Sequence, residues 1–172
     1  MVRLFSYGGD MIRTLTFVIG LGGAAGLSQF PEFSQQYVQR LGGAVDELTR
    51  VANDFDASAA AEGLTREDAL AQMVGTGFVE RRRVDMENTF DRLDRLSADL
   101  FALRDASAVQ RLTQAARLRD TELAQATWQD FKPAVPLTLD GAICALVGFI
   151  AAGGVIGAIL RLPRLFRRRR TA

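Results

Sequence analysis

Hydrophobic residues gather in two long runs, and the stretch between the runs is amphipathic. The first run covers residues 11–30, with Arg13 as its one charged residue, and the second covers residues 136–160, with Asp140 as its one charged residue. A helix of 20 residues is about 30 Å long, which is the thickness of the hydrocarbon core of a bilayer. Each run therefore predicts a transmembrane helix.

The stretch after the first run predicts a long helix, because its hydrophobic residues recur at intervals of three or four. From Tyr37 onward the pattern is heptad-like, as in a coiled coil. The helix is expected to end near Ala60. Its weakest point is Gly42-Gly43, since each glycine inside a helix costs about 1 kcal/mol relative to alanine. The positions that carry the pattern are Phe33, Tyr37, Leu41, Ala44, Leu48, Val51 and Phe55.

Three further helices are predicted at residues 65–74, 78–105 and 107–131. Thr65 and Asp68 have the spacing of a capping box at the start of the first of these. No segment shows strand-like alternation of useful length. A chain that leaves the membrane and returns to the same side needs an even number of helices in between. The predicted fold is an all-α membrane protein, in which two transmembrane helices flank an antiparallel four-helix bundle.

This interpretation divides the chain into five parts. They are an N-terminal segment at 1–10, a first transmembrane helix at 11–30, a helical domain at 31–133, a second transmembrane helix at 136–160 and a basic tail at 161–172.

Charge sets the predicted orientation. Residues 31–133 contain 18 acidic and 13 basic residues, whereas every charged residue after Leu160 is an arginine. Basic residues beside a membrane segment mark its cytoplasmic side, and Arg3 and Arg13 flank the first run. Both termini are therefore predicted to be cytoplasmic, and in a bacterial cell the central domain would be periplasmic. The arginines expected to contact anionic lipid are Arg161, Arg164, Arg167, Arg168, Arg169 and Arg170.

A cleaved signal peptide is an alternative interpretation of the first run. Gly23-Ala24-Ala25 would then be the small-residue cleavage site. The central domain is translocated under either interpretation.

Small residues recur in both runs at the spacing that lets helices approach closely in lipid. The residues predicted to pack membrane helices together are Gly22, Gly26, Gly148, Ala152, Gly153 and Gly157. The sequence leaves open whether this packing occurs within one chain or between chains.

Aromatic residues and prolines cluster at both ends of the helical domain. Tyr and Trp favour the membrane interface, and proline fits a break between segments. We define these clusters as the exit and entry collars, and their predicted members are Phe30, Pro31, Phe33, Tyr37, Trp128, Phe131 and Pro133.

The ionisable residues exclude much chemistry. The chain has no histidine and one cysteine, Cys144, so it has no histidine-based triad or usual zinc or haem site. Glu80, Asp85 and Glu87 neutralise the arginines at 81–83, which predicts a solvated helix face. Asp140 has two interpretations, a cap at the start of the second membrane helix or a buried proton or ion site.

Three segments resemble a known family. They read SQFPEFSQQYVQRLGGAVDEL, LTREDAL and ATWQDFKPAVP, and they lie between the two apolar runs. The chain resembles an uncharacterised proteobacterial family, domain of unknown function twenty-nine thirty-seven. The resemblance implies a bacterial inner-membrane protein, and it implies no activity, ligand or catalytic residue.

These observations predict a non-enzymatic structural or accessory membrane protein without a cofactor. Its expected partners are the bilayer, with anionic lipid at the cytoplasmic face, and either a second copy or another membrane protein; no nucleic-acid partner is expected. Two alternatives stay open, a periplasmic ligand-sensing module that acts through a separate transducer and an oligomeric pore.

Overall fold

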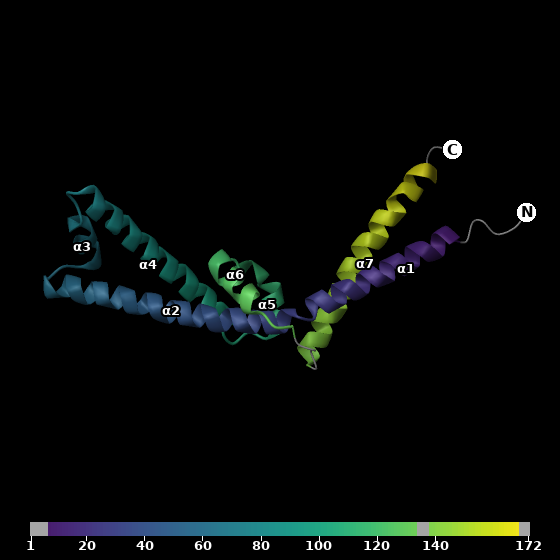
Figure 1. The fold of residues 1–172 in the computed structure, drawn as a ribbon, viewed down its shortest axis with the longest axis horizontal. Helices are drawn as coiled ribbons and strands as arrows, with labels where there is room; N and C mark the ends of the chain where they lie inside the picture. The colour runs from purple at the N-terminus through teal and green to yellow at the C-terminus, as the bar shows by residue number, and fades with distance from the viewer. Residues whose placement is uncertain (1–6, 134–137, 169–172) are drawn as a thin grey trace, which may run out of the picture. The chain divides into compact units, whose positions relative to one another are not determined.

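The computed structural model describes residues 7–133 and 138–168, and within them the side chains of 11–133 and 138–160. In this part of the chain all regular structure is helical, so the all-α prediction is confirmed (Figure 1). In chain order the elements are α1 (Tyr7–Leu27), α2 (Phe30–Ala61), α3 (Arg66–Gln72), α4 (Gly77–Leu103), α5 (Ala108–Thr113), the 3₁₀ helix η1 (Ala115–Arg117), α6 (Thr121–Asp130) and α7 (Leu139–Arg168).

The chain forms two compact units. The first, which we call the hairpin unit, comprises Met1–Ser34, Ser107–Thr113 and Phe131–Ala172. The second, which we call the helical unit, comprises Gln35–Ala106 and Gln114–Asp130.

The hairpin unit is built on α1 and α7, which cross one another and run in opposite directions (Figure 1). By length and composition, two helical stretches could cross a membrane, one within Met11–Ala61 and one at Leu139–Leu160. Large apolar side chains point outward from both helices, among them Phe17, Leu146 and Ile150. The two helices therefore bury only a narrow strip of their surface against each other.

The core of the helical unit lies between α2 and α4. Tyr37 and Leu41 from α2 are fully buried against Leu96 and Leu103 from α4. Leu118, Leu123 and Ala124 cover this core from the side. Four positions of the heptad-like pattern belong to this core or pack against it, namely Tyr37, Leu41, Ala44 and Leu48. The pattern thus marks the buried face of α2 correctly, and α2 continues through its two glycines without a break.

At the other end of the helical unit, α3 is held by its first residue. The Arg66 guanidinium makes two hydrogen bonds to the Asp56 carboxylate, at 2.7 and 2.5 Å, and stacks over the Phe90 ring at 4.3 Å. Phe90 also packs edge to face on Phe55 of α2. Thr65 accepts a hydrogen bond from the Asp68 N–H, as the capping spacing predicted.

The predicted four-helix arrangement is not confirmed. Among the described residues, α3 contributes none that is buried, and α5 belongs to the hairpin unit. The core of the helical unit is therefore formed by α2, α4 and the segment that contains α6. Figure 1 shows α3 between the ends of α2 and α4, which diverge toward it, and its 7 residues are too few to form a full return helix.

The prediction of one helix over 107–131 is wrong. The segment forms α5, η1 and α6 instead. In a continuous helix the Asp120 N–H would donate to the carbonyl four residues earlier, but here it donates to the hydroxyl of Tyr37. The segment thus leaves the α-helix after Thr113, and α6 begins at Thr121 with Asp120 as its cap.

A pair of substitutions in α4 tests this core. Leu103→Ala removes a fully buried side chain, so we expect it to lower the free energy of unfolding by about 2–5 kcal/mol. Phe101→Ala on the same helix removes a side chain that is 90% exposed, and we expect a far smaller change. Circular dichroism of the full chain in detergent, followed through a denaturant series, measures both. Equal losses for the two variants would contradict the core described above.

Candidate functional site

The closest approach in the hairpin unit joins the backbones of α1 and α7. A Cβ atom on Gly148 would overlap the carbonyl oxygen of Gly23, and a Cβ atom on Gly23 would lie 2.5 Å from the Cβ atom of Ala152. Atoms in folded proteins do not approach so closely, so only glycine fits at these two positions. Close backbone approach is what stabilises helix pairs in lipid, where hydrophobic burial supplies no driving force.

The contact continues toward the chain termini. A Cβ atom on Gly153 would lie 3.4 Å from the carbonyl oxygen of Thr16, and one on Gly157 would lie 3.6 Å from the Thr16 methyl carbon. Gly20 has the Phe149 ring against it. The contact therefore spans about three turns of α7.

The residues predicted to pack membrane helices together fall into two groups. Those that lie against α1 within the chain are Gly148, Ala152, Gly153 and Gly157. Nothing lies within 4 Å of a Cβ atom built on Gly22 or Gly26, so packing through these two stays a prediction about another chain. The sequence reasoning missed Gly20 and Gly23. Gly20 and Gly23 are three residues apart, which places them on one face of the helix. This spacing is the sequence signal that could have identified them.

An aromatic pair joins the exit and entry collars in the hairpin unit. α1 ends in a turn where the Ser28 hydroxyl donates to the Ala25 carbonyl at 2.8 Å. Phe33, which follows this turn in α2, packs edge to face on Phe131 with ring centroids 6.0 Å apart. Phe30, Pro31 and Pro133 belong to the same unit. A position of these residues at a membrane surface stays a prediction.

Two collar residues belong to the helical unit and have opposite environments. Tyr37 is fully buried in the core, whereas Trp128 is 71% exposed. The structure thus places Tyr37 in the core that the α2 pattern predicted. The Tyr37 side chain therefore has no exposed surface that could contact lipid headgroups.

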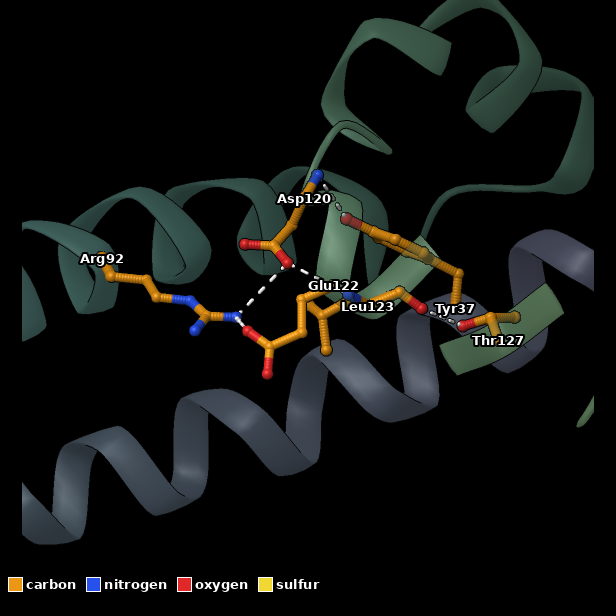
Figure 2. Close-up of polar contacts among 6 residues, drawn as sticks. All are labelled: Tyr37, Arg92, Asp120, Glu122, Leu123 and Thr127. Carbon is orange, nitrogen blue, oxygen red and sulfur yellow. Dashed lines mark hydrogen bonds and ion pairs between the residues drawn. The ribbon is translucent and has the colours of Figure 1, made fainter. Parts of the chain in front are cut away.

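Asp120 joins the three helices of this core (Figure 2). Its carboxylate accepts hydrogen bonds from the Leu123 N–H at 3.1 Å and from the Arg92 guanidinium of α4 at 3.3 Å. Its own N–H donates to the Tyr37 hydroxyl of α2 at 3.3 Å. Asp120 therefore caps α6 and ties that helix to α2 and α4 at the same point. An aspartate directly before Thr121 and an acidic first turn is a helix-start signal that the sequence reasoning did not use.

Further contacts complete this polar cluster, which we define as Tyr37, Arg92, Asp120, Glu122, Leu123 and Thr127. Arg92 also pairs with Glu122 at 2.8 Å, and the buried Thr127 hydroxyl donates to the Leu123 carbonyl at 2.7 Å (Figure 2). Burial raises the pKa of the Tyr37 hydroxyl above its ordinary value. The cluster orients α6 rather than presenting a reactive group.

Two ion pairs hold the segment on either side of Asp120. Before it, Arg117 pairs with the buried Asp99 of α4 at 2.9 Å. At the far end of α6, Asp130 pairs with Arg40 of α2. A carboxylate as buried as Asp99 requires such a partner, because an unpaired buried charge is costly.

Asp140 does not cap its own helix. The Thr138 hydroxyl accepts from the Gly141 N–H at 3.2 Å and caps α7, while the Asp140 carboxylate accepts from the Ala108 N–H at the start of α5. Asp140 therefore caps a helix, as one interpretation predicted, but that helix is α5 and not α7. This hydrogen bond gives the carboxylate a structural partner outside the second apolar run.

The arginines at 81–83 have acidic neighbours, as predicted. Arg82 pairs with Asp85 at 3.1 Å and Arg83 pairs with Glu87 at 2.8 Å. In the part of the chain that the structure describes, no group of three His, Cys, Asp or Glu side chains gathers to hold a metal ion.

The basic tail lies outside the described side chains. Arg169 and Arg170 lie outside the described residues, and the side chains of Arg161, Arg164, Arg167 and Arg168 lie outside the described side chains. Their contact with anionic lipid stays a prediction.

Comparison with known proteins places this architecture in a family. A family profile described as protein of unknown function DUF2937 matches residues 9–169, which include both apolar helices and the whole helical unit. The chain belongs to the DUF2937 family. This confirms the resemblance carried by the three sequence segments. The DUF2937 description adds no activity, and no curated protein and no solved structure matches the chain.

A crosslinking experiment tests the α1–α7 contact of this DUF2937 chain. Thr16→Cys with Gly157→Cys, in a Cys144→Ala background, places two thiols where the helices touch. We expect an intramolecular disulfide. Gly148→Leu should lower its yield about tenfold or more, since overpacking costs about 1–3 kcal/mol. Non-reducing gel mobility of the full chain in membranes is the measurement.

Gly22→Leu is the matched control for that experiment. It adds the same side chain to α1 at a position with no atom within 4 Å, so the disulfide yield should not change. Equal losses for Gly148→Leu and Gly22→Leu, or a disulfide only between chains, would contradict the contact.

The raised pKa of Tyr37 predicts an alkaline loss of stability. The folded chain holds this proton more tightly than the unfolded chain, in which the pKa is near 10.0. The contribution of Tyr37 to the free energy of unfolding is therefore intact below pH 10.0. It is lost as the pH rises through the raised pKa of the folded chain. Tyr37→Phe should flatten this alkaline loss and, at neutral pH, cost about 1 kcal/mol for the lost hydrogen bond to Asp120.

Denaturant midpoints measured across neutral and alkaline pH provide the test. Tyr7→Phe changes the other tyrosine of the chain and serves as the control, with the wild-type pH profile expected. A Tyr37→Phe profile as steep as that of the wild type would rule out Tyr37 as the source.

Proposed function

We propose that this chain is a non-enzymatic structural or accessory protein of the bacterial inner membrane. The hairpin unit spans the bilayer, both termini are cytoplasmic, and the helical unit associates in the periplasm with a second copy or with another membrane protein. The observation that carries the proposal is the outward surface of the hairpin unit. α1 and α7 use glycine to meet each other, and their large apolar side chains point away from the contact.

Exposure supports a lipid environment for this surface. Leu146 is 60% exposed and Val155 is 59% exposed, and Leu21 points outward from the opposite helix. A continuous apolar surface of this kind is unfavourable in water and marks an interaction or membrane surface. Both helices also satisfy their own backbone hydrogen bonds, as a membrane requires.

The arrangement of charge supports the proposed orientation. The Tyr7 end of α1 and the Arg168 end of α7 lie on the same side of the hairpin unit (Figure 1). The sequence puts Arg13 near that end of α1 and a run of arginines near that end of α7. Under the positive-inside rule this is the cytoplasmic side.

A surface of the helical unit supports association. Phe101 of α4 is 90% exposed. It borders a hollow of about 310 Å³ that is also lined by Val45 and Leu100. Exposed aromatic residues beside a hollow are typical of the residues that dominate binding energy at protein interfaces. We therefore assign the partner contact to this part of α4.

Gentle purification of the full chain tests the proposal. The wild type should resist alkaline extraction from membranes and should elute in mild detergent at a mass above that of one chain, or together with another membrane protein. Phe101→Glu should release the partner, because it places a charge in the centre of the proposed contact. Mass measurement and identification of the proteins that elute together give the result.

Asn88→Glu is the matched control, since Asn88 is exposed on the same helix and lies away from the hollow around Phe101. It should leave the assembly intact. Extraction of the wild type by alkali would overturn the membrane location. A monomeric wild type that elutes alone would overturn the association.

A further inference from the structure

A groove of about 540 Å³ lies between α1 and α7 in the hairpin unit. The helices touch at Gly23 and Gly148 and diverge toward the Tyr7 and Arg168 ends (Figure 1). The residues that line the groove, among them Arg13 and Gly154, lie on that side of the contact. Its volume is within the range of roughly 300–1,000 Å³ found for small-molecule sites.

The wall of the groove is apolar and carries one charge. Phe17 and Phe149 meet edge to face, with ring centroids 5.8 Å apart, and form part of the lining together with Ile150 and Gly154. Arg13 is the one ionisable residue among those that line it. Among the described side chains, Arg13 has no hydrogen bond or ion pair to a carboxylate.

The position of Arg13 in the groove favours a ligand that is long, apolar and negatively charged at one end. The sequence of α7 continues past the groove into Arg161 and Arg164, so the charge at this end of the hairpin unit is positive. A guanidinium binds a phosphate group through charge-assisted hydrogen bonds. In the membrane location of the proposed function, an acyl chain is the apolar group available to fill the groove.

We infer that this groove binds one anionic phospholipid, with an acyl chain between Phe149, Ile150 and Gly154 and the headgroup phosphate on Arg13. The inference rests on the proposed membrane location. It adds a defined lipid site to the general attraction of the basic tail for the cytoplasmic leaflet. Arg13 selects the lipid by charge, and the gap between the helices accommodates its chain.

Native mass spectrometry of the full chain tests the site. The protein is equilibrated in detergent with equal amounts of phosphatidylglycerol and phosphatidylcholine that carry identical acyl chains, and the lipids that stay bound are counted. The wild type should retain one phosphatidylglycerol in preference to phosphatidylcholine. Arg13→Gln should reduce this preference about fivefold, which is the effect of one arginine at an anionic surface, and Arg13→Lys should restore most of it.

Gly154→Leu tests the acyl-chain part of the site. No atom lies within 4 Å of a Cβ atom built on Gly154, so leucine fills the groove without pushing α1 away, and retention of phosphatidylglycerol should fall. Gly26→Leu is the matched control, because Gly26 is equally open but does not line the groove. Its lipid retention should equal that of the wild type.

Three outcomes would overturn the inference. The first is a wild type that shows no preference between the two lipids. The second is an unchanged preference in Arg13→Gln, with loss instead when Arg167 to Arg170 are changed to Gln, which would place the lipid on the tail. The third is equal retention by Gly154→Leu and Gly26→Leu. Alkaline extraction of the same preparations separates these outcomes from failure of the proposed function, since a chain that is not in the membrane is released.

Discussion

The contact between the backbones of α1 and α7 at Gly23 and Gly148 is the constraint on which the hairpin unit depends. Because neither position has room for a Cβ atom, the helices approach most closely there, and they diverge toward the Tyr7 and Arg168 ends (Figure 1). The close approach leaves large apolar side chains on the outside of the pair. The divergence leaves the groove beside Arg13. The outward surface and the groove therefore have one physical cause, and both are consequences of where glycine occurs.

The helical unit is organised by a different kind of interaction. Its apolar core is small, and Asp120 adds hydrogen bonds to three helices at one point. Buried Tyr37 supplies both apolar contact and a hydroxyl acceptor, so one side chain belongs to the core and to the polar cluster. The Asp99–Arg117 pair fixes the segment just before α6. Polar contacts thus add to the apolar contacts of Leu123 and Ala124 in positioning α6.

The two units support one function by different surfaces. The hairpin unit exposes apolar side chains that the proposal places in lipid, and the helical unit exposes Phe101 beside a hollow to which the proposal assigns a protein partner. Charged residues that the sequence analysis weighed as possible sites make structural contacts. Asp140 satisfies the first N–H of α5, and the arginines at 82 and 83 pair with acids one turn away. A scaffold or accessory role is consistent with polar groups used in this way.

The sequence by itself determined the elements whose signals are local. Periodicity and composition located the two apolar helices, the buried face of α2 and its end at Ala61 close to the predicted Ala60, and a capping pair located the start of α3. Only the tertiary structure decided where α6 begins within the predicted 107–131 helix, because the Asp120 N–H donates to Tyr37, which lies 83 residues away. It also assigned Asp140 to a helix 32 residues earlier in the chain. Glycine spacing predicted that helices would pack together. Which glycines meet depends on how two helices cross, and the crossing is set by contacts between helices rather than by the sequence of either helix.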